Sequence, residues 1–222
     1  MEHKTQELEK LFRQGLKQLG IELDPHRVQR LIGYCEELRK WNRKINLIAR
    51  NTSVQDIVEK HFLDSLALVP VLRELEYGGG PLLDVGSGAG FPGLVLKIAR
   101  PDVPVLLLEP RHRRAAFLRH MIRTMNLDGI EVSTARVEDQ GAISGYDFDA
   151  ITGRAVADVS RFLEMAGPGI GQKTTVLCMQ GPAGRQRWEV GSVAGPMRCV
   201  KIFETVLPWS RSQRFILIFQ RT

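Results

Sequence analysis

The sequence predicts an α/β protein with a doubly wound, mostly parallel sheet of seven strands, an N-terminal helical lobe and a C-terminal antiparallel hairpin. Three observations lead to this prediction. The first 76 residues show only helical spacing of apolar residues, the middle alternates strands with helices, and the last two apolar segments lie too close together for a crossover. We therefore expect a helical lobe over residues 1–76 and a sheet-containing domain over residues 77–222.

The predicted lobe contains three helices. Apolar side chains recur every three or four positions over residues 5–20. Asp24 followed by Pro25 is typical of an N-cap and a first helical turn, so a second helix should run from there to Trp41. Residues 53–75 form the third expected helix, because three residues with capping side chains precede or open this segment.

The run Gly78-Gly79-Gly80-Pro81 separates the lobe from the predicted sheet. Alternating strands and helices after it indicate a parallel sheet with helices on both faces. The expected strands are 82–85, 103–109, 130–134, 148–152 and 174–179, and the expected helices are 91–100, 111–125 and 159–166. Residues 200–207 and 214–220 are two further strands, which must pair as a hairpin because a parallel crossover needs a dozen or more residues.

Composition excludes several classes of protein. The chain has 222 residues, 43% of them hydrophobic and 25% charged, as is ordinary for a globular protein. No apolar run approaches the roughly 20 residues of a membrane span, and the charged N-terminus does not resemble a signal peptide. The three cysteines form no C-x-x-C pair, so neither a disulfide framework nor a metal cluster is expected. We expect a cytoplasmic protein that binds no metal.

The net charge of +6 is concentrated in one segment. Residues 1–78 carry 13 Lys and Arg against 12 Asp and Glu, whereas residues 97–123 carry 7 against 2. A local basic surface favours a polyanionic partner, although a solvated helix face explains the same charges.

A glycine-rich loop follows the first predicted strand and indicates a nucleotide-like ligand. Counted from the strand end at Val85, it reads Asp84-x-Gly86-x-Gly88-x-Gly90 and continues with Phe91-Pro92. A carboxylate at Asp84 and the bulk of Phe91 suit a dinucleotide pyrophosphate poorly, because that group needs room at the helix N-terminus. They suit S-adenosylmethionine, which has no phosphate and carries a sulfonium and an ammonium charge.

Two more polar sites follow the next strands. Glu109 stands at the end of the second strand, 23 residues after Gly86, where an acid in this fold class binds ribose hydroxyls. The alternative for Glu109 is a surface acid at a strand end. The run Arg136-Val137-Glu138-Asp139 follows the third strand, where such loops usually hold the adenine edge.

The chain resembles the bacterial 16S ribosomal RNA guanine-N7 methyltransferases, also called the glucose-inhibited division protein B family. The motifs that carry the resemblance are Trp41-Asn42-x-x-Ile45-Asn46-Leu47, His61-x-x-Asp64-Ser65-Leu66, the loop 83–93, Phe117-Leu118, Arg136-Val137-Glu138 and Arg154-Ala155-Val156. The resemblance implies a Rossmann-like class I methyltransferase fold and methyl transfer from S-adenosylmethionine to N7 of a guanine, with S-adenosylhomocysteine as product. It also implies cofactor contacts at Gly86, Phe91, Val137, Glu138 and Arg154.

The resemblance further implies that small-subunit RNA or the 30S particle is the partner. We expect a monomer without a membrane partner. For RNA binding, basic residues of the lobe and of helix 111–125 would have to form one surface; the candidates are Arg43, Lys44, Arg113, Arg114 and Arg123. The family has a lysine before a glycine after the fifth strand, where this chain has Gln180-Gly181. That difference concerns RNA affinity more than the cofactor site.

Several roles stay open from the residues alone. Arg154 follows the fourth strand, and it could hold the cofactor, donate to guanine O6, or form a salt bridge to Asp149 or Asp158. His61 and Asp64 lie on one helix face, where a packing role against the glycine loop fits better than a catalytic dyad. The open alternatives in function are a methyltransferase with a small-molecule or protein acceptor, and a cofactor-binding regulator without activity.

Overall fold

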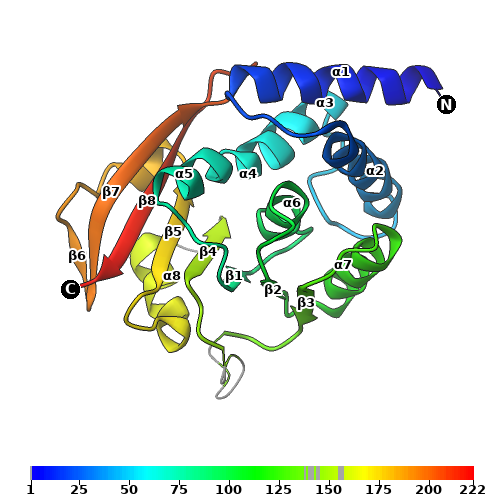
Figure 1. The fold of residues 1–222 in the computed structure, drawn as a ribbon. Coiled ribbons are helices and arrows are strands. Elements are labelled where there is room, and N and C mark those ends of the chain that lie inside the picture. The colour runs from blue at the N-terminus through cyan, green and yellow to red at the C-terminus, as the bar shows by residue number, and fades with distance from the viewer. Residues whose placement is uncertain (1, 138, 140–142, 144–145, 155–157) are drawn as a thin grey trace.

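The computed structural model of the chain describes residues 2–137, 139, 143, 146–154 and 158–222 (Figure 1). The N-terminal region is helical, as predicted. Its elements are α1 (Glu2–Gln18), α2 (Pro25–Asn42), α3 (Val54–Ile57), the π-helical segment η1 (Val58–Leu63), α4 (Asp64–Leu66) and α5 (Leu68–Glu74). The predicted third helix is therefore interrupted by a π-helical turn, a feature that is often found at functional sites.

Local sequence explains where these helices begin. The Asp24 side chain accepts a hydrogen bond from the amide of Arg27 and Pro25 occupies the first turn of α2. The Ser53 hydroxyl caps α3 in the same way by accepting from the amide of Asp56. The predicted N-cap Asp24 is confirmed, and Ser53 is the cap among the three residues that the sequence offered for the third helix. In the part of the chain that the structure describes, no helix has the length and hydropathy needed to cross a membrane.

The remaining chain forms one mixed sheet with the order β3-β2-β1-β4-β5-β8-β7-β6. Its strands are β1 (Leu82–Val85), β2 (Val105–Leu108), β3 (Ile130–Ser133), β4 (Ala150–Arg154), β5 (Thr175–Gln180), β6 (Val193–Ala194), β7 (Met197–Val206) and β8 (Gln213–Arg221). The helices between them are α6 (Gly93–Ala99), α7 (His112–Thr124), α8 (Val159–Ala166), η2 (Gly167–Gly169) and α9 (Pro182–Arg185).

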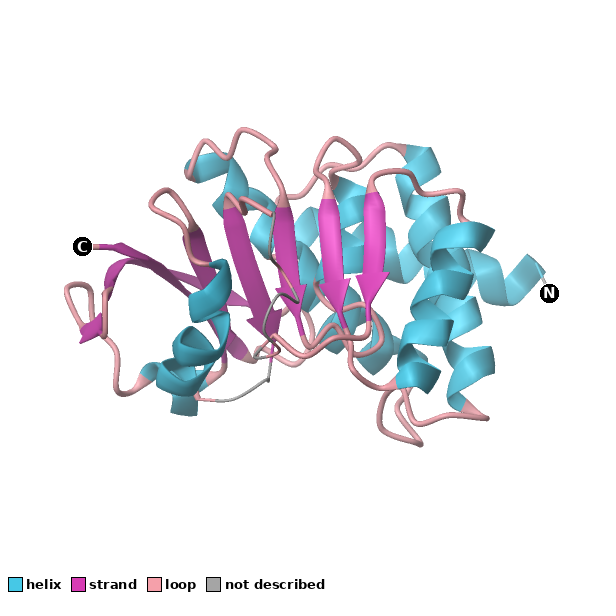
Figure 2. Ribbon diagram, turned by 90° about the horizontal axis from the view of Figure 1, so that it is seen from below, coloured by secondary structure: helices cyan, strands magenta, loops and turns pink. Residues whose placement is uncertain are grey.

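Strands β1 to β5 are parallel, and β8 and β7 add the predicted antiparallel hairpin. All seven predicted strands are present, but the number seven is wrong, because the two-residue strand β6 pairs with β7 at the sheet edge. So short a strand carries no alternating apolar pattern that a sequence could reveal. Figure 2 shows helices on both sides of the sheet and the parallel strands ending at a common edge.

Two clusters of buried side chains cover the two faces of the sheet. The larger one joins the N-terminal helices, α6 and α7 to one face, and the smaller one places α8 against the other face. The chain runs outward from β1 through β2 to β3 and then crosses to β4 and β5 on the other side of β1. Ligands in open α/β sheets bind outside the carboxyl ends of the strands at such a switch point.

Candidate functional site

The glycine loop leaves the carboxyl end of β1 in a tight turn. Gly86, Gly88 and Gly90 all have positive φ angles, of 70°, 59° and 94°. Residues that carry a Cβ rarely adopt positive φ angles. The path of the backbone therefore requires glycine at these three positions. The turn is fixed to the neighbouring strand because the amide of Ser87 donates to the carbonyl of Leu108 over 2.9 Å.

The helical lobe supports this loop from one side. The Tyr34 hydroxyl on α2 donates a hydrogen bond to the carbonyl of Ala89. The Tyr34 ring stacks on Phe91 with ring centroids 5.6 Å apart, and the ring of His61 stacks on Phe91 at 5.1 Å. The lobe thus contributes directly to the shape of the loop.

Asp84 lies beneath the loop and is fully buried. Its Oδ2 accepts a hydrogen bond of 3.0 Å from the amide of Gly93, the first residue of α6. Its Oδ1 has no partner among the described residues. Burial raises the pKa of this carboxyl to about 6, and the hydrogen bond from Gly93 opposes the shift. The observed contact of Asp84 is therefore with the start of α6, and the structure does not bring its side chain to the cavity described next.

A cavity of about 870 Å³ opens at the carboxyl ends of the parallel strands. This volume lies within the usual range for small-molecule sites. The predicted residues Gly86, Gly88, Phe91, Glu109 and Arg154 all lie on its wall. The other lining residues are Leu47, Ile48, Lys60, His61, Asp64, Ser87, Ala89, Pro110, Arg111, Arg114, Arg136, Met179, Gln180, Gly181 and Arg214.

Glu109 holds the cavity wall together between two loops. It is only 3% exposed. Its Oε2 accepts from the amide of Gly88 and its Oε1 accepts from the amide of Arg111, each over 2.8 Å. Each carboxylate oxygen can accept a further hydrogen bond, so Glu109 can bind two hydroxyl groups of a ligand without losing its backbone contacts.

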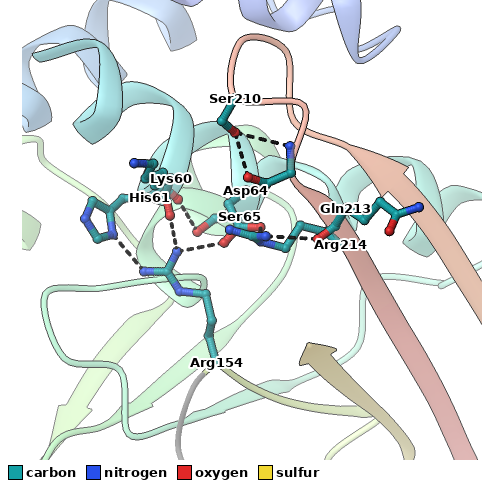
Figure 3. A network of polar contacts seen from close by, with 9 residues as sticks. Lys60, His61, Asp64, Ser65, Arg154, Ser210, Gln213 and Arg214 are labelled. Atoms are coloured by element: carbon teal, nitrogen blue, oxygen red, sulfur yellow. Dashed lines mark hydrogen bonds and ion pairs between the residues drawn. The ribbon is translucent and has the colours of Figure 1, made fainter. Parts of the chain in front are cut away.

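Arg154 connects the end of β4 to the π-helical turn (Figure 3). Its Nη1 donates to the carbonyl of Lys60 over 2.7 Å and to Oδ2 of Asp64 over 3.1 Å, and its Nη2 lies 3.1 Å from Nδ1 of His61. Its guanidinium also lies 5.2 Å from the centroid of the Phe91 ring. The salt-bridge alternative is correct in kind, but the partner is Asp64 rather than Asp149 or Asp158.

His61 is a neutral hydrogen-bond acceptor in this network. Burial, together with the charges of Arg154 and Lys60, lowers the pKa of His61 to about 4. An imidazole whose Nδ1 is unprotonated can accept from Arg154, in agreement with the short distance between them. The packing role predicted for His61 is confirmed by its stacking on Phe91.

The lowered pKa of His61 predicts acid destabilisation. An unfolded histidine, with a pKa near 6.5, binds its proton before the folded one does, so stability must fall as pH decreases from about 6.5 to 4. The variant His61→Phe keeps a ring against Phe91 and removes this titration. Between pH 7.5 and pH 4, the unfolding free energy of the native protein should fall by about 3 kcal/mol relative to that of the variant.

Urea unfolding of both proteins across this pH range measures the difference. Asp84 titrates with the opposite sign, because its raised pKa means that stability is lost as pH rises through about 6. That contribution is present in both proteins and cancels in the difference. Parallel stability curves for the two proteins would contradict the buried neutral state of His61.

Two further residues, Val137 and Glu138, are predicted from the sequence to bind the cofactor, and the described part of the cavity wall includes neither. Val137 is buried in the smaller core cluster and does not line the cavity. Glu138 lies outside the described residues. Its neighbour Arg136 does line the cavity. Sequence reasoning did not single out Arg214 or Lys60, because only the docking of distant segments places them on this wall.

The predicted RNA-binding residues divide into two groups. Lys44, Arg113 and Arg114 line a second hollow of about 420 Å³ beside the main cavity, together with Ile45, Asn46, Arg50, Arg111 and His112. Arg114 and Arg111 line both hollows. Arg43 lines a third, separate hollow together with Arg39. Arg123 lies in the last turn of α7 and lines neither the main cavity nor the second hollow. The structure therefore brings three of the five candidates together.

Among the described residues, no group of three or more His, Cys, Asp or Glu side chains is placed to hold a metal ion.

The residues present do fit S-adenosylmethionine. The glycine loop leaves its backbone open to the cavity, since a Cβ on Gly88 would meet no atom closer than 3.8 Å. Beside it stand Glu109, which can accept from hydroxyl groups, and the apolar groups of Leu47, Ile48 and Phe91.

Comparison with solved structures identifies the fold. The fold is similar to that of a proposed O-methyltransferase from Klebsiella pneumoniae, with a TM-score of 0.61 and 17% identity over 99% of this chain and 100% of that one. It is also similar to a mutant of MtNAS crystallised with S-adenosylmethionine, with a TM-score of 0.57 and 18% identity over 86% of this chain and 74% of that one. The fold is that of the class I methyltransferases.

Sequence comparison then identifies the family. A family model described as rRNA small subunit methyltransferase G matches residues 27–201. A ribosomal RNA small subunit methyltransferase G from Desulfotalea psychrophila is 44% identical over 93% of this chain and 95% of its own length. One from Syntrophotalea carbinolica is 36% identical over 100% and 98%. The chain belongs to this family and is an S-adenosylmethionine-dependent methyltransferase.

Proposed function

We propose that this protein transfers a methyl group from S-adenosylmethionine to N7 of a guanine in the 16S RNA of the small ribosomal subunit. The observation that carries the proposal is the charge around the cavity. Among the residues that the structure describes, six basic ones line it, namely Lys60, Arg111, Arg114, Arg136, Arg154 and Arg214. The two acids of that described wall, Asp64 and Glu109, are already bound to donors of the protein. Such a wall favours a polyanionic acceptor.

The cofactor is assigned to the half of the cavity formed by the glycine loop and Glu109. We propose that Gly86 and Gly88 offer their backbone, that Phe91 provides an apolar surface, and that Glu109 accepts from the ribose hydroxyls. Val137 and Glu138 remain candidates for the adenine side. Asp84 acts from beneath the loop, through Gly93. When bound, S-adenosylmethionine supplies a methyl group that its sulfonium charge has already activated.

The acceptor chemistry asks little of the protein in proton transfer. N7 of guanine carries an in-plane lone pair and no proton, so no general base is needed. The protein has to align the base, exclude water and leave N7 free, with hydrogen bonds directed to other edges of the base. The proposed catalytic residue is Arg154, which lies on the cavity wall against Phe91 and has donor capacity beyond its contacts with the lobe.

RNA binding is assigned to the basic hollow beside the cavity. Lys44, Arg113 and Arg114 would contact phosphates, whose neutralisation makes binding sensitive to salt. Arg43 and Arg123 would extend this surface only if the RNA wraps beyond the hollow. We further propose that the protein acts as a monomer in the cytoplasm, with RNA or the 30S particle as partner and without a membrane.

The test uses 30S particles from a strain that lacks this protein, incubated with the purified protein and methyl-tritiated S-adenosylmethionine. We expect label in the RNA, recovered as 7-methylguanine after digestion, and an affinity that falls steeply from low to moderate salt. Label found only in ribosomal protein would instead support a protein acceptor. Calorimetric binding of the cofactor without turnover on any acceptor would support a regulator.

A further inference from the structure

Two buried carboxylates of the π-helical turn region hold the C-terminal hairpin. Glu59 and Asp64 are 2% and 4% exposed. Oε1 of Glu59 accepts from the amides of Trp209 and Ser210, over 2.5 Å and 2.8 Å, in the connection between β7 and β8. Oδ1 of Asp64 accepts from Nε of Arg214 over 3.1 Å, near the start of β8. The helical lobe thus sets the position of the hairpin end that reaches the cavity.

Asp64 is shared by two guanidinium groups from strands that are not neighbours (Figure 3). Arg154 donates both hydrogens of Nη1, one to the carbonyl of Lys60 and one to Asp64, and it donates one hydrogen of Nη2 to His61. Arg214 donates from Nε to Asp64 and from Nη1 to the carbonyl of its neighbour Gln213. Within the described part of the chain, Nη2 of Arg214 has no hydrogen-bond partner, and the side chain is 24% exposed on the cavity wall.

The charges around Arg214 do not balance. Lys60 forms its own ion pair with Asp56, with Nζ 2.6 Å from Oδ1 of Asp56, so its charge is compensated. Arg154 and Arg214 share the single carboxylate of Asp64, which leaves one positive charge in excess between these two strands. Glu109 stands at the other end, bound to the glycine loop. A neutral base edge would leave the excess positive charge uncompensated, whereas a phosphate would compensate it and match the planar fork of an arginine.

We propose that Asp64 is a positioning residue that aims Arg214 into the cavity, where the free N–H groups of Arg214 bind a phosphate of the RNA beside the target base. This inference rests on the proposed RNA substrate. The proposal means that the hairpin also contacts the acceptor. The hairpin is separate from both the cofactor loop and the basic hollow.

The experiment compares Arg214→Gln with Arg221→Gln, which removes the same charge from the exposed far end of the same strand. We expect Arg214→Gln to raise KM for 30S particles about tenfold, with affinity for S-adenosylmethionine unchanged. The slope of log KM against log salt should become shallower by about one, as for the loss of one phosphate contact. Arg221→Gln should behave like the native protein.

Two further variants separate positioning from charge. Asp64→Asn should reproduce the KM and salt-slope changes of Arg214→Gln, and the double variant should show no further change in these two quantities. Because Asp64 also accepts from Arg154, a fall in kcat in Asp64→Asn reports the separate loss at Arg154. Arg214→Lys keeps the charge and should retain the native salt slope even if KM rises. Thermal unfolding of each protein establishes that it is folded under the conditions of the assay.

The outcomes are distinguishable. An unchanged KM and salt slope in Arg214→Gln overturns the inference, and so does a raised KM with an unchanged slope, which indicates a neutral acceptor group. If the native protein itself fails to methylate RNA in 30S particles, the proposed function fails and not this inference alone.

Discussion

Replacing Glu109 with alanine is expected to weaken S-adenosylmethionine binding by about 100-fold or more. The native carboxylate joins the amides of Gly88 and Arg111. In the proposed function its remaining lone pairs accept from the ribose hydroxyls. Hydrogen bonds to a charged group contribute about 1.5–3 kcal/mol each, so two lost ribose contacts correspond to roughly two to four powers of ten. Gly88 also loses the anchor that fixes its position. Isothermal titration of the purified variant measures the effect.

The matched control is Glu131→Ala, because Glu131 is an exposed acid on the next strand. It should bind the cofactor as the native protein does. Glu109→Gln keeps two polar atoms, but its amide nitrogen cannot accept from a backbone N–H, so it should fall between the native protein and Glu109→Ala. If all three variants bind the cofactor equally, Glu109 does not contact it.

The overall fold could be predicted because its signals are local. Three of these signals are visible in the sequence itself: the alternation of strands and helices, the turn at the four residues after Tyr77, and the short distance between the last two strands. The glycine loop was recognisable for the same reason, since positive φ angles at Gly86, Gly88 and Gly90 demand glycine at fixed spacing. The sequence also predicted that Phe91, Glu109 and Arg154 lie on the cavity wall, because each comes shortly after or at the end of a parallel strand and these ends meet at one edge of the sheet.

The direction of individual side chains could not be predicted in this way. Asp84 precedes the first glycine, but it points beneath the loop to Gly93 and not into the cavity. Arg214 reaches the cavity because β8 pairs with β5, a long-range arrangement without a local signal. Its partner Asp64 lies 150 residues earlier in the sequence. Arg43 and Lys44 are adjacent in sequence, yet they line different hollows because the chain turns there at the end of α2.

Replacing Gly93 with alanine is expected to destabilise the fold by about 3–5 kcal/mol. A Cβ at this position would lie 2.5 Å from Cδ2 of Leu107 and 2.7 Å from Oδ2 of Asp84. Extra atoms in a packed core cost about 1–3 kcal/mol. Here they also displace the buried carboxylate from the amide of Gly93, a hydrogen bond to a charged group that contributes about 1.5–3 kcal/mol. For a chain of this size, the melting temperature should fall by roughly 10 °C.

The comparison variant is Gly33→Ala, in the interior of α2. A Cβ there would meet no atom within 4 Å, so the substitution gains helix propensity without a clash. It should stabilise the protein by up to about 1 kcal/mol. Thermal and urea unfolding of both variants therefore test the sign of the effect as well as its size. A melting temperature for Gly93→Ala equal to that of the native protein would mean that the core accommodates the added Cβ without breaking the contact between Asp84 and the amide of residue 93.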